Sequence, residues 1–190
     1  MLSWLFGNKK DQAARGEDSV WMSGSARLKG IGREVERLAK EGHCVVVVAR
    51  TLVTFDELVR DLEQRKPLLC RDLFGFDRLR GQLTVAGSAA IALANILSTD
   101  VKPITSVPVD ILVHGRSDSR TVDDAIVRFA DLIGPNARIA FQLSLDDALL
   151  KDYIGTLKQL LTRLDVPEDE AISSPMVTRA IARAQAKKSP

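Results

Sequence analysis

The run Cys44–Ala49, with the sequence CVVVVA, is the feature that most constrains how this chain can fold. It is short, continuous and rich in β-branched residues, and it contains no polar position that could face water. A strand with one wet face alternates apolar and polar residues, whereas a strand covered on both faces does not. The run therefore predicts the central strand of a mostly parallel sheet with helices on both faces.

The remaining segments alternate between strand-like and helix-like patterns, which is the order typical of an α/β domain. We expect strands at His43–Ala49, Leu68–Leu73, Leu83–Ala86, Val109–Val113 and Arg138–Leu143. We expect helices at Ala26–Lys40, Thr54–Arg65, Ser88–Ser98, Ser119–Ile133 and Leu145–Leu164. Thr54 and Glu57 have the spacing of a capping box at the start of the second helix. The predicted fold class is a three-layer α/β/α domain with a mostly parallel sheet of about five or six strands.

Composition limits the class of protein. At 190 residues and 45% hydrophobic content, the chain is long enough to bury one proper core. The net charge of +2 comes without a dense basic stripe, so no nucleic acid partner is expected. Cys44 and Cys70 lie in apolar runs, which indicates reduced, buried thiols, and with only His43 and His114 besides, no metal site is expected.

Several segments resemble, in order, one domain of a known family. Gly81–Ile96, GQLTVAGSAAIALANI, is similar without a gap to GAVTIATNMAGRGTDI, which carries helicase motif V in SecA, the ATPase of bacterial preprotein translocation. In this register Leu83–Ala86 keeps the strand, while Ala92 replaces an arginine and Asn95 an aspartate. Four other segments resemble the same domain: VWMSGSARLKGIGREV (20–35), VVVARTLVTFDEL (46–58), AFQLSLDDAL (140–149) and SSPMVTRAIARAQAK (173–187). The resemblance implies the RecA-like second nucleotide-binding domain of SecA, a member of the P-loop NTPase superfamily.

The arginines of motif VI are mostly lost in this resemblance. Ser117–Ala125, SDSRTVDDA, is similar to HESRRIDNQ, so that Arg120 keeps the first arginine and Thr121 replaces the second. Further on, Phe129 and Leu132 stand where the family has arginine fingers, although a slip of one residue would bring Arg128 into use. Such arginines place fixed positive charge against charge that develops on a transferring phosphoryl group. The P-loop motif GxxxxGK[ST] does not occur in the chain, and no catalytic residue is assigned.

The resulting hypothesis is a catalytically degenerate SecA-like domain that acts as a protein-interaction or regulatory module linked to protein translocation. Its partner would be another protein or a second copy. The alternative is an ATPase component acting in trans with a P-loop-bearing partner, with ATP or ADP and Mg²⁺ bound between them. Candidate nucleotide- or anion-binding residues are Gly87, Ser88, Arg116, Arg120 and Arg128.

Each of these candidates has a plain structural alternative. Gly87 and Ser88, placed between a predicted strand and a predicted helix, would point backbone amides outward as anion sites do, but a turn that merely packs closely explains the same residues. The arginines are equally typical of exposed ion pairs. His114 ends an apolar strand, and the sequence assigns it no catalytic partner.

The first eleven residues, MLSWLFGNKKD, resemble the start of SecA, where a short amphipathic segment associates with acidic phospholipid. Candidate membrane-contact residues are Leu2, Trp4, Leu5, Phe6, Lys9 and Lys10. The segment is too short to span a bilayer, and its aromatic residues pack on the domain or on another subunit in the simpler interpretation. We divide the chain into an N-terminal segment (1–17), the SecA-like domain (18–166) and a C-terminal amphipathic helix with a tail (167–190). The expected location is cytoplasmic or peripheral at the inner membrane.

Overall fold

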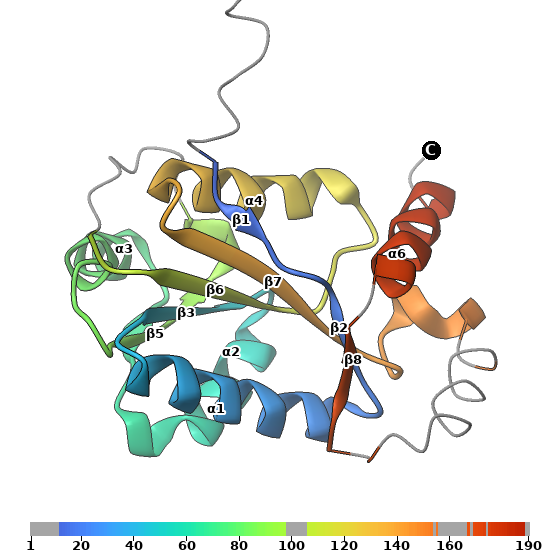
Figure 1. The fold of residues 1–190 in the computed structure, drawn as a ribbon, viewed down its shortest axis with the longest axis horizontal. Coiled ribbons are helices and arrows are strands. Elements are labelled where there is room, and N and C mark those ends of the chain that lie inside the picture. The colour runs from blue at the N-terminus through green and yellow to red at the C-terminus, as the bar shows by residue number, and fades with distance from the viewer. Residues whose placement is uncertain are drawn as a thin grey trace, which may run out of the picture.

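The computed structural model describes residues 12–97, 106–153, 155, 167, 169–173 and 175–188. Its centre is an eight-stranded sheet in the order β4-β5-β3-β6-β7-β2-β8, with β1 beside β7 (Figure 1). The strands are β1 Ala14–Arg15, β2 Ser19–Trp21, β3 Cys44–Ala49, β4 Leu68–Cys70, β5 Ala89–Leu93, β6 Val109–His114, β7 Ala137–Ser144 and β8 Ala171–Ser173. Neighbouring strands are parallel except β2 and β8, which are antiparallel.

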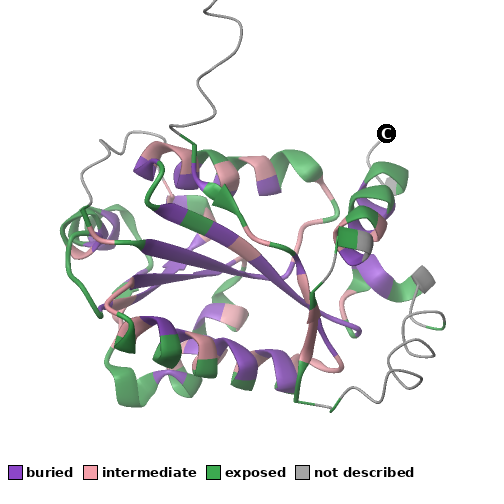
Figure 2. Ribbon diagram, in the orientation of Figure 1, coloured by how far each residue is buried: buried purple, intermediate pink, exposed green. Residues whose placement is uncertain are grey.

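Helices cover both faces of this sheet. Helices α1 (Gly24–Lys40) and α2 (Leu52–Asp61) lie on one face, and α3 (Leu73–Gln82) and α4 (Arg120–Ile133) lie on the other (Figure 1). Phe76 of α3 and Phe129 of α4 have ring centroids 6.1 Å apart, so the two helices on that second face contact each other. The sheet between the layers is buried along most of its length (Figure 2). The predicted three-layer α/β/α class with a mostly parallel sheet is therefore confirmed, with more strands than expected.

The central strand lies where the sequence predicts it. All six residues of β3 are fully buried, and β3 pairs with β5 on one side and β6 on the other. Val46 in the middle of β3, for example, is in register with Ala90 on β5 and with Ile111 on β6. Neighbouring strands pair with both edges of β3, and its side chains are buried on both faces of the sheet. This burial explains the run of valines.

The strand predicted at Leu83–Ala86 and the helix predicted at Ser88–Ser98 are wrong. The strand at this place is β5, Ala89–Leu93, followed by the short 3₁₀-helix η3, Ala94–Ile96. Leu83–Ala86 instead belongs to a turn in which the Val85 N–H donates to the Gln82 carbonyl at 2.9 Å. Alanine favours helices by intrinsic propensity, but Ala90 and Ala92 are fully buried between helical layers, where small side chains fit a strand.

This correction bears on the motif V resemblance. Leu83–Ala86, which the resemblance matches to the family's strand, forms a turn, and the strand of this region is β5. Ala92, matched to an arginine of the family, lies buried within β5.

Four elements escaped the sequence patterns: α3, β1, β2 and β8. Helix α3 begins where the strand Leu68–Leu73 was expected to end, because Asp72 caps it by accepting from the Gly75 N–H at 2.8 Å. The start of α2 also differs, since Thr51 and not Thr54 is the N-cap and accepts from the Thr54 N–H at 3.2 Å. Helix α2 ends at Asp61 and is followed by the 3₁₀-helix η2, Glu63–Arg65.

The C-terminal part packs on the domain. Within the predicted helix Leu145–Leu164, the structure has the 3₁₀-helix η4, Ala148–Tyr153, and the later residues except Gly155 lie outside the described part. Helix α6, Pro175–Lys188, contacts η4 and β8, and it buries Val177, Ile181 and Ala184. These apolar positions thus find their partner within the same chain. None of the described helices combines the length and the apolar character needed to cross a membrane.

Candidate functional site

Polar side chains gather where the central parallel strands end. Arg50 directly follows β3, Gly115 and Arg116 follow β6, and Asp146 and Asp147 come shortly after β7. Parallel strands have their carboxyl ends at one edge of the sheet, where open α/β sheets usually bind ligands. We call this region the carboxyl edge. It is the candidate site.

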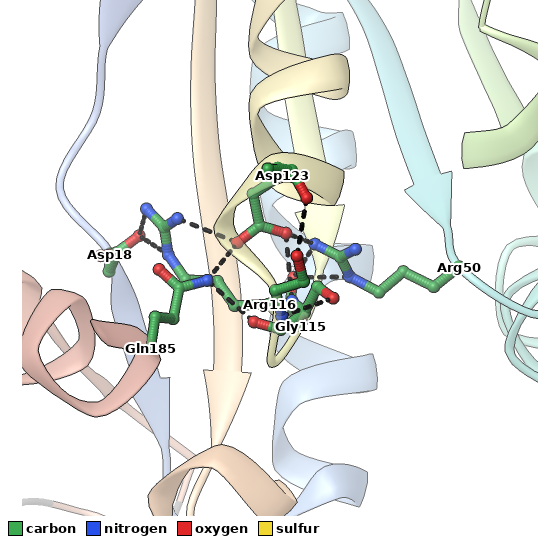
Figure 3. A network of polar contacts seen from close by, with 9 residues as sticks. Asp18, Arg50, Gly115, Arg116, Asp123 and Gln185 are labelled. Carbon is green, nitrogen blue, oxygen red and sulfur yellow. Dashed lines mark hydrogen bonds and ion pairs between the residues drawn. The ribbon is translucent and has the colours of Figure 1, made fainter. Parts of the chain in front are cut away.

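Asp123 is the centre of the carboxyl edge (Figure 3). It lies in the first turn of α4, it is 1% exposed, and its carboxylate accepts four kinds of donor. These donors are the Arg50 guanidinium, Arg116 Nη1 at 3.2 Å, the Ser117 N–H at 3.0 Å and Gln185 Nε2 at 2.7 Å. Arg50 and Arg116 approach it from two sides, and Gln185 reaches it from α6. One carboxylate therefore holds together β3, β6, α4 and α6.

Arg116 has a second acidic partner in Asp18. Arg116 Nη2 and Nε donate to Asp18 Oδ1 at 2.8 and 3.0 Å. The guanidinium carbon of Arg116 also lies 3.8 Å from the centroid of the Phe141 ring, a cation–π contact. Burial raises the pKa of the Asp18 carboxyl, and the neighbouring Arg116 opposes that rise. The second oxygen of Asp18 is buried without a hydrogen-bond partner.

A second, partly buried ion pair lies at the other side of the edge. Arg27 of α1 donates through Nη1 to both carboxylate oxygens of Asp147 at 2.7 and 2.8 Å. Asp147 also accepts from the Ser144 N–H and hydroxyl, which fixes the turn after β7. Between this pair and Arg50 is a cavity of about 370 Å³, which His114, Thr51 and Thr54 also line.

His114 is held neutral in this cavity. Burial lowers its pKa to about 4, and the nearby Arg27 and Arg50 act in the same direction. The side chain is 8% exposed, so protonation would bury a charge beside two cations. His114 therefore acts here as a neutral polar group.

Stability should consequently fall on mild acidification. The unfolded chain binds a proton at His114 below about pH 6.5, whereas the folded chain binds it only near pH 4, so unfolding gains a proton across that window. We expect a loss of about 2 kcal/mol between pH 7 and pH 5, measured by urea unfolding. His114→Asn should remove this loss of stability. The variant keeps the contribution of Asp18, which has the opposite sign, because its raised pKa favours the folded state as pH falls. If the parent and His114→Asn lost the same stability between pH 7 and pH 5, His114 would not be the group responsible.

The positive charges of the arginines at the carboxyl edge are neutralised by carboxylates of the same chain. Arg27, Arg50 and Arg116 each bind a carboxylate that is buried or nearly so. A phosphate entering the cavity would have to compete with these aspartates for the same donors. Desolvated arginine–carboxylate pairs of this geometry are costly to separate, because each leaves an uncompensated charge.

The structure separates the residues that the sequence proposed for nucleotide or anion binding. Arg116 lies at the carboxyl edge, but inside the ion-pair network. Arg120, the first residue of α4, is also at this edge; its side chain is 79% exposed and pairs weakly with Asp124 at 4.0 Å. Arg128 is exposed farther along α4 and does not line the cavity. Phe129, at a predicted arginine-finger position, is fully buried in the core.

Gly87 and Ser88 lie elsewhere. They precede β5, so they are at the opposite edge of the sheet and not between a strand and a helix as predicted. The Ser88 N–H and hydroxyl both donate to the Val85 carbonyl, at 3.4 and 2.6 Å. The reason for predicting an anion site at this turn is therefore removed. The membrane-contact candidates Leu2, Trp4, Leu5, Phe6, Lys9 and Lys10 lie outside the described residues.

Several residues of the site were missed by reasoning from sequence, namely Asp18, Arg27, Arg50, Asp123, Asp147 and Gln185. One signal was present for Arg50, since a charged residue directly after a buried strand marks the carboxyl edge of a parallel sheet. Gln185 and Asp18 carried no such signal. Within the described part of the chain, no group of three or more His, Cys, Asp or Glu side chains is placed to hold a metal ion.

Comparison with known proteins links part of this chain to one family. No family model matches the chain. The protein translocase subunit SecA 1 of Corynebacterium jeikeium (strain K411) is 38% identical over 78 residues, which is 40% of this chain and 9% of that protein. SecA of Dechloromonas aromatica (strain RCB) is 38% identical over 78 residues, and SecA 1 of Mycobacterium sp. (strain KMS) is 41% identical over 76. The resemblance to SecA is thus confirmed over 40% of the chain. The matched segment spans less than a tenth of the length of these curated relatives.

Two solved structures are similar in outline. The structure of T4 UvsW matches with a TM-score of 0.48 and 14% identity over 65% of this chain and 26% of that one. The C-terminal part of the Fun30 ATPase domain matches with a TM-score of 0.48 and 8% identity over 85% of this chain and 52% of that one.

Proposed function

We propose that this SecA-like domain works through protein contact, as an interaction or regulatory module linked to protein translocation, and does not hydrolyse ATP by itself. The link to translocation rests on the similarity to SecA over 40% of the chain. The mode of action rests on the carboxyl edge. A domain of this kind would act by presenting that edge to another protein.

The proposal is carried by the positions of the exposed apolar side chains. Among the described residues, seven large apolar side chains are exposed. Five of these seven lie in the first turns of helices that begin at the carboxyl edge: Leu52, Val53, Leu73, Phe74 and Val122. Single exposed apolar residues are ordinary, but a concentration on one edge is typical of a protein interface.

The internal pairing of the arginines supports the absence of hydrolysis. Catalysis of phosphoryl transfer needs positive charge that is free to meet the phosphate oxygens. Arg27, Arg50 and Arg116 are instead bound to Asp147, Asp123 and Asp18. The chain also contains no GxxxxGK[ST] motif to cradle phosphates.

Calorimetric titration of the purified protein with ATP and with ADP in Mg²⁺ tests this proposal. We expect no saturable binding at ligand concentrations on the order of millimolar, because Arg27, Arg50 and Arg116 are already neutralised by carboxylates of the chain. The same titration of Arg120→Ala serves as the control. Saturable binding that this substitution weakens would overturn the proposal.

A second candidate function is an ATPase component acting in trans, and the exposure of Arg120 favours it. Arg120 is at the carboxyl edge and has only a weak ionic contact, so it is free to reach a nucleotide held by a P-loop-bearing partner. The sequence offered Arg120 or Arg128 for this role, and the position of Arg128 farther along α4 favours Arg120. Contact of residues 1–11 with a membrane surface is a third proposal, to be separated by liposome flotation of the intact chain and of a truncated one.

A further inference from the structure

A second cavity, of about 490 Å³, lies between α1 and the strands β6, β7, β2 and β8. It shares no lining residue with the cavity at the carboxyl edge. Its floor consists of Asp110 and Leu112 from β6 and Arg138, Ala140 and Gln142 from β7. We call it the α1 cavity. Its volume falls within the range of about 300–1,000 Å³ that is usual for small-molecule sites.

Two polar side chains of this floor are more than nine-tenths buried. Asp110 is 5% exposed, and its Oδ2 lies 2.6 Å from His43 Nδ1. Gln142 is 6% exposed, and its Oε1 accepts from Trp21 Nε1 at 2.9 Å. The indole lies against α1 because Gly30 has no side chain there, and the ring forms a wall of the cavity. The polar groups of the floor are therefore held in fixed positions.

Asp110 and Arg138 are neighbours on this floor that do not pair with each other. They are in register on the parallel strands β6 and β7, and neighbouring strands lie about 4.8 Å apart. The Asp110 carboxylate is bound to His43, whereas Arg138 has no ion pair within the described part of the chain. Two opposite charges thus stand side by side in the cavity, and each can take a further partner.

The remaining charges of the lining leave the α1 cavity neutral. Arg33 pairs with Asp169 at 2.8 Å, and Arg37 pairs with Glu34 at 2.6 Å. Glu17 has no ion pair among the described residues. The lining therefore carries three guanidinium groups and three carboxylates. A phosphate would face the three carboxylates and a polyamine the three guanidinium groups, so a ligand with one charge of each sign suits the cavity best.

We propose that the α1 cavity binds the zwitterion of an apolar α-amino acid. Its ammonium group donates to Asp110 and its carboxylate accepts from Arg138, and both bonds are charge-assisted. An α-amino acid carries these two groups on one carbon, which matches two neighbours in register. The next pair on the same face is Leu112 and Ala140, with Trp21 beyond, so the apolar side chain lies over them. This inference does not depend on the proposed function.

NMR titration of the full-length, ¹⁵N-labelled chain with L-leucine is the test. We expect saturable shifts of the Trp21 indole N–H and the Gln142 side-chain amide, since both groups line the cavity. Leucinamide lacks the carboxylate and N-acetyl-leucine lacks the cation, so each is expected to bind at least about tenfold more weakly. Glycine, which has no apolar side chain, should also bind about tenfold more weakly.

Two variants assign the charges. Arg138→Ala is expected to weaken L-leucine at least about tenfold but to leave the affinity for leucinamide unchanged, because leucinamide has no carboxylate to lose a partner. Asp110→Asn should weaken L-leucine and leave N-acetyl-leucine unchanged, with urea unfolding to show that this buried substitution keeps the fold. Arg78→Ala is the matched control, since Arg78 is an exposed arginine of α3 that does not line the cavity.

Three outcomes would overturn the inference. The first is the absence of saturable shifts with L-leucine. The second is equal weakening of L-leucine by Arg138→Ala and by Arg78→Ala. The third is leucinamide that binds as tightly as L-leucine, which would mean that the cavity takes the first residue of a peptide and not a free amino acid. None of these results bears on ATP binding at the carboxyl edge.

Discussion

Replacing Asp123 with alanine is expected to destabilise the fold by about 3–5 kcal/mol, the range measured when one partner of a buried ion pair is removed. Asp123 is 1% exposed and is the shared acceptor of Arg50 and Arg116. Without it, the Gly115 carbonyl at 3.3 Å is the one hydrogen-bond acceptor left to Arg50 within the described part of the chain, and burial already lowers the pKa of its guanidinium. Among the described residues, Arg50 would then have no ion-pair partner, and Arg116 would keep Asp18.

Urea unfolding of the variant beside the parent protein measures this effect. Asp124→Ala is the matched control, because Asp124 is the next residue on α4, its side chain is half exposed, and its contact with Arg120 is 4.0 Å long. We expect the control to change the free energy of unfolding by no more than about 0.5 kcal/mol. Equal effects of the two substitutions would show that the cluster does not hold the carboxyl edge together.

A methyl group added at Gly30 is expected to cost about 3 kcal/mol, at the upper end for overpacked cores. Gly30 lies in α1, and a Cβ there would be 2.0 Å from Cη2 of Trp21. The indole is held in place, since it is 8% exposed and its Nε1 donates to Gln142 Oε1 at 2.9 Å. Neither α1 nor the ring can move without disturbing the contact between the helix and β7.

Gly81→Ala should have the opposite sign. Gly81 lies in the last turn of α3, and nothing would lie within 4 Å of an added Cβ. Alanine there reduces the freedom of the unfolded chain, so we expect a gain of about 0.5–1 kcal/mol. Thermal unfolding of Gly30→Ala, Gly81→Ala and the parent would show both shifts. The packing explanation fails if Gly30→Ala melts at the same temperature as the parent.

Much of the architecture could be predicted from local sequence. The strand Cys44–Ala49 and the helices that became α1 and α4 were predicted almost to their ends, because each shows a strong period over many residues. The family resemblance was also legible in sequence over part of the chain. Where the period is weak, prediction failed: Ser88–Ser98 was expected to be a helix, but AAIAL within it pairs with β3 and β4 as a strand.

The candidate site was predicted less well. Arg116 and Arg120 were expected at the nucleotide face and do lie at the carboxyl edge, but nothing in the sequence shows that Arg116 is neutralised. Gly87 and Ser88 were placed at the wrong edge because the strand beside them was misplaced by six residues. An error in the position of one strand thus moved two candidate residues across the sheet.

The sequence by itself determined the layered α/β/α architecture, since a continuous β-branched run such as CVVVVA is stable only when it is covered on both faces. It also determined the likeness to SecA. Only the tertiary structure decided which charge each arginine meets: Arg50 pairs with Asp123, 73 residues away, and Arg116 with Asp18, 98 residues away. No local pattern encodes such pairs, because ion pairs depend on distance in space, and the sheet order alone sets that distance.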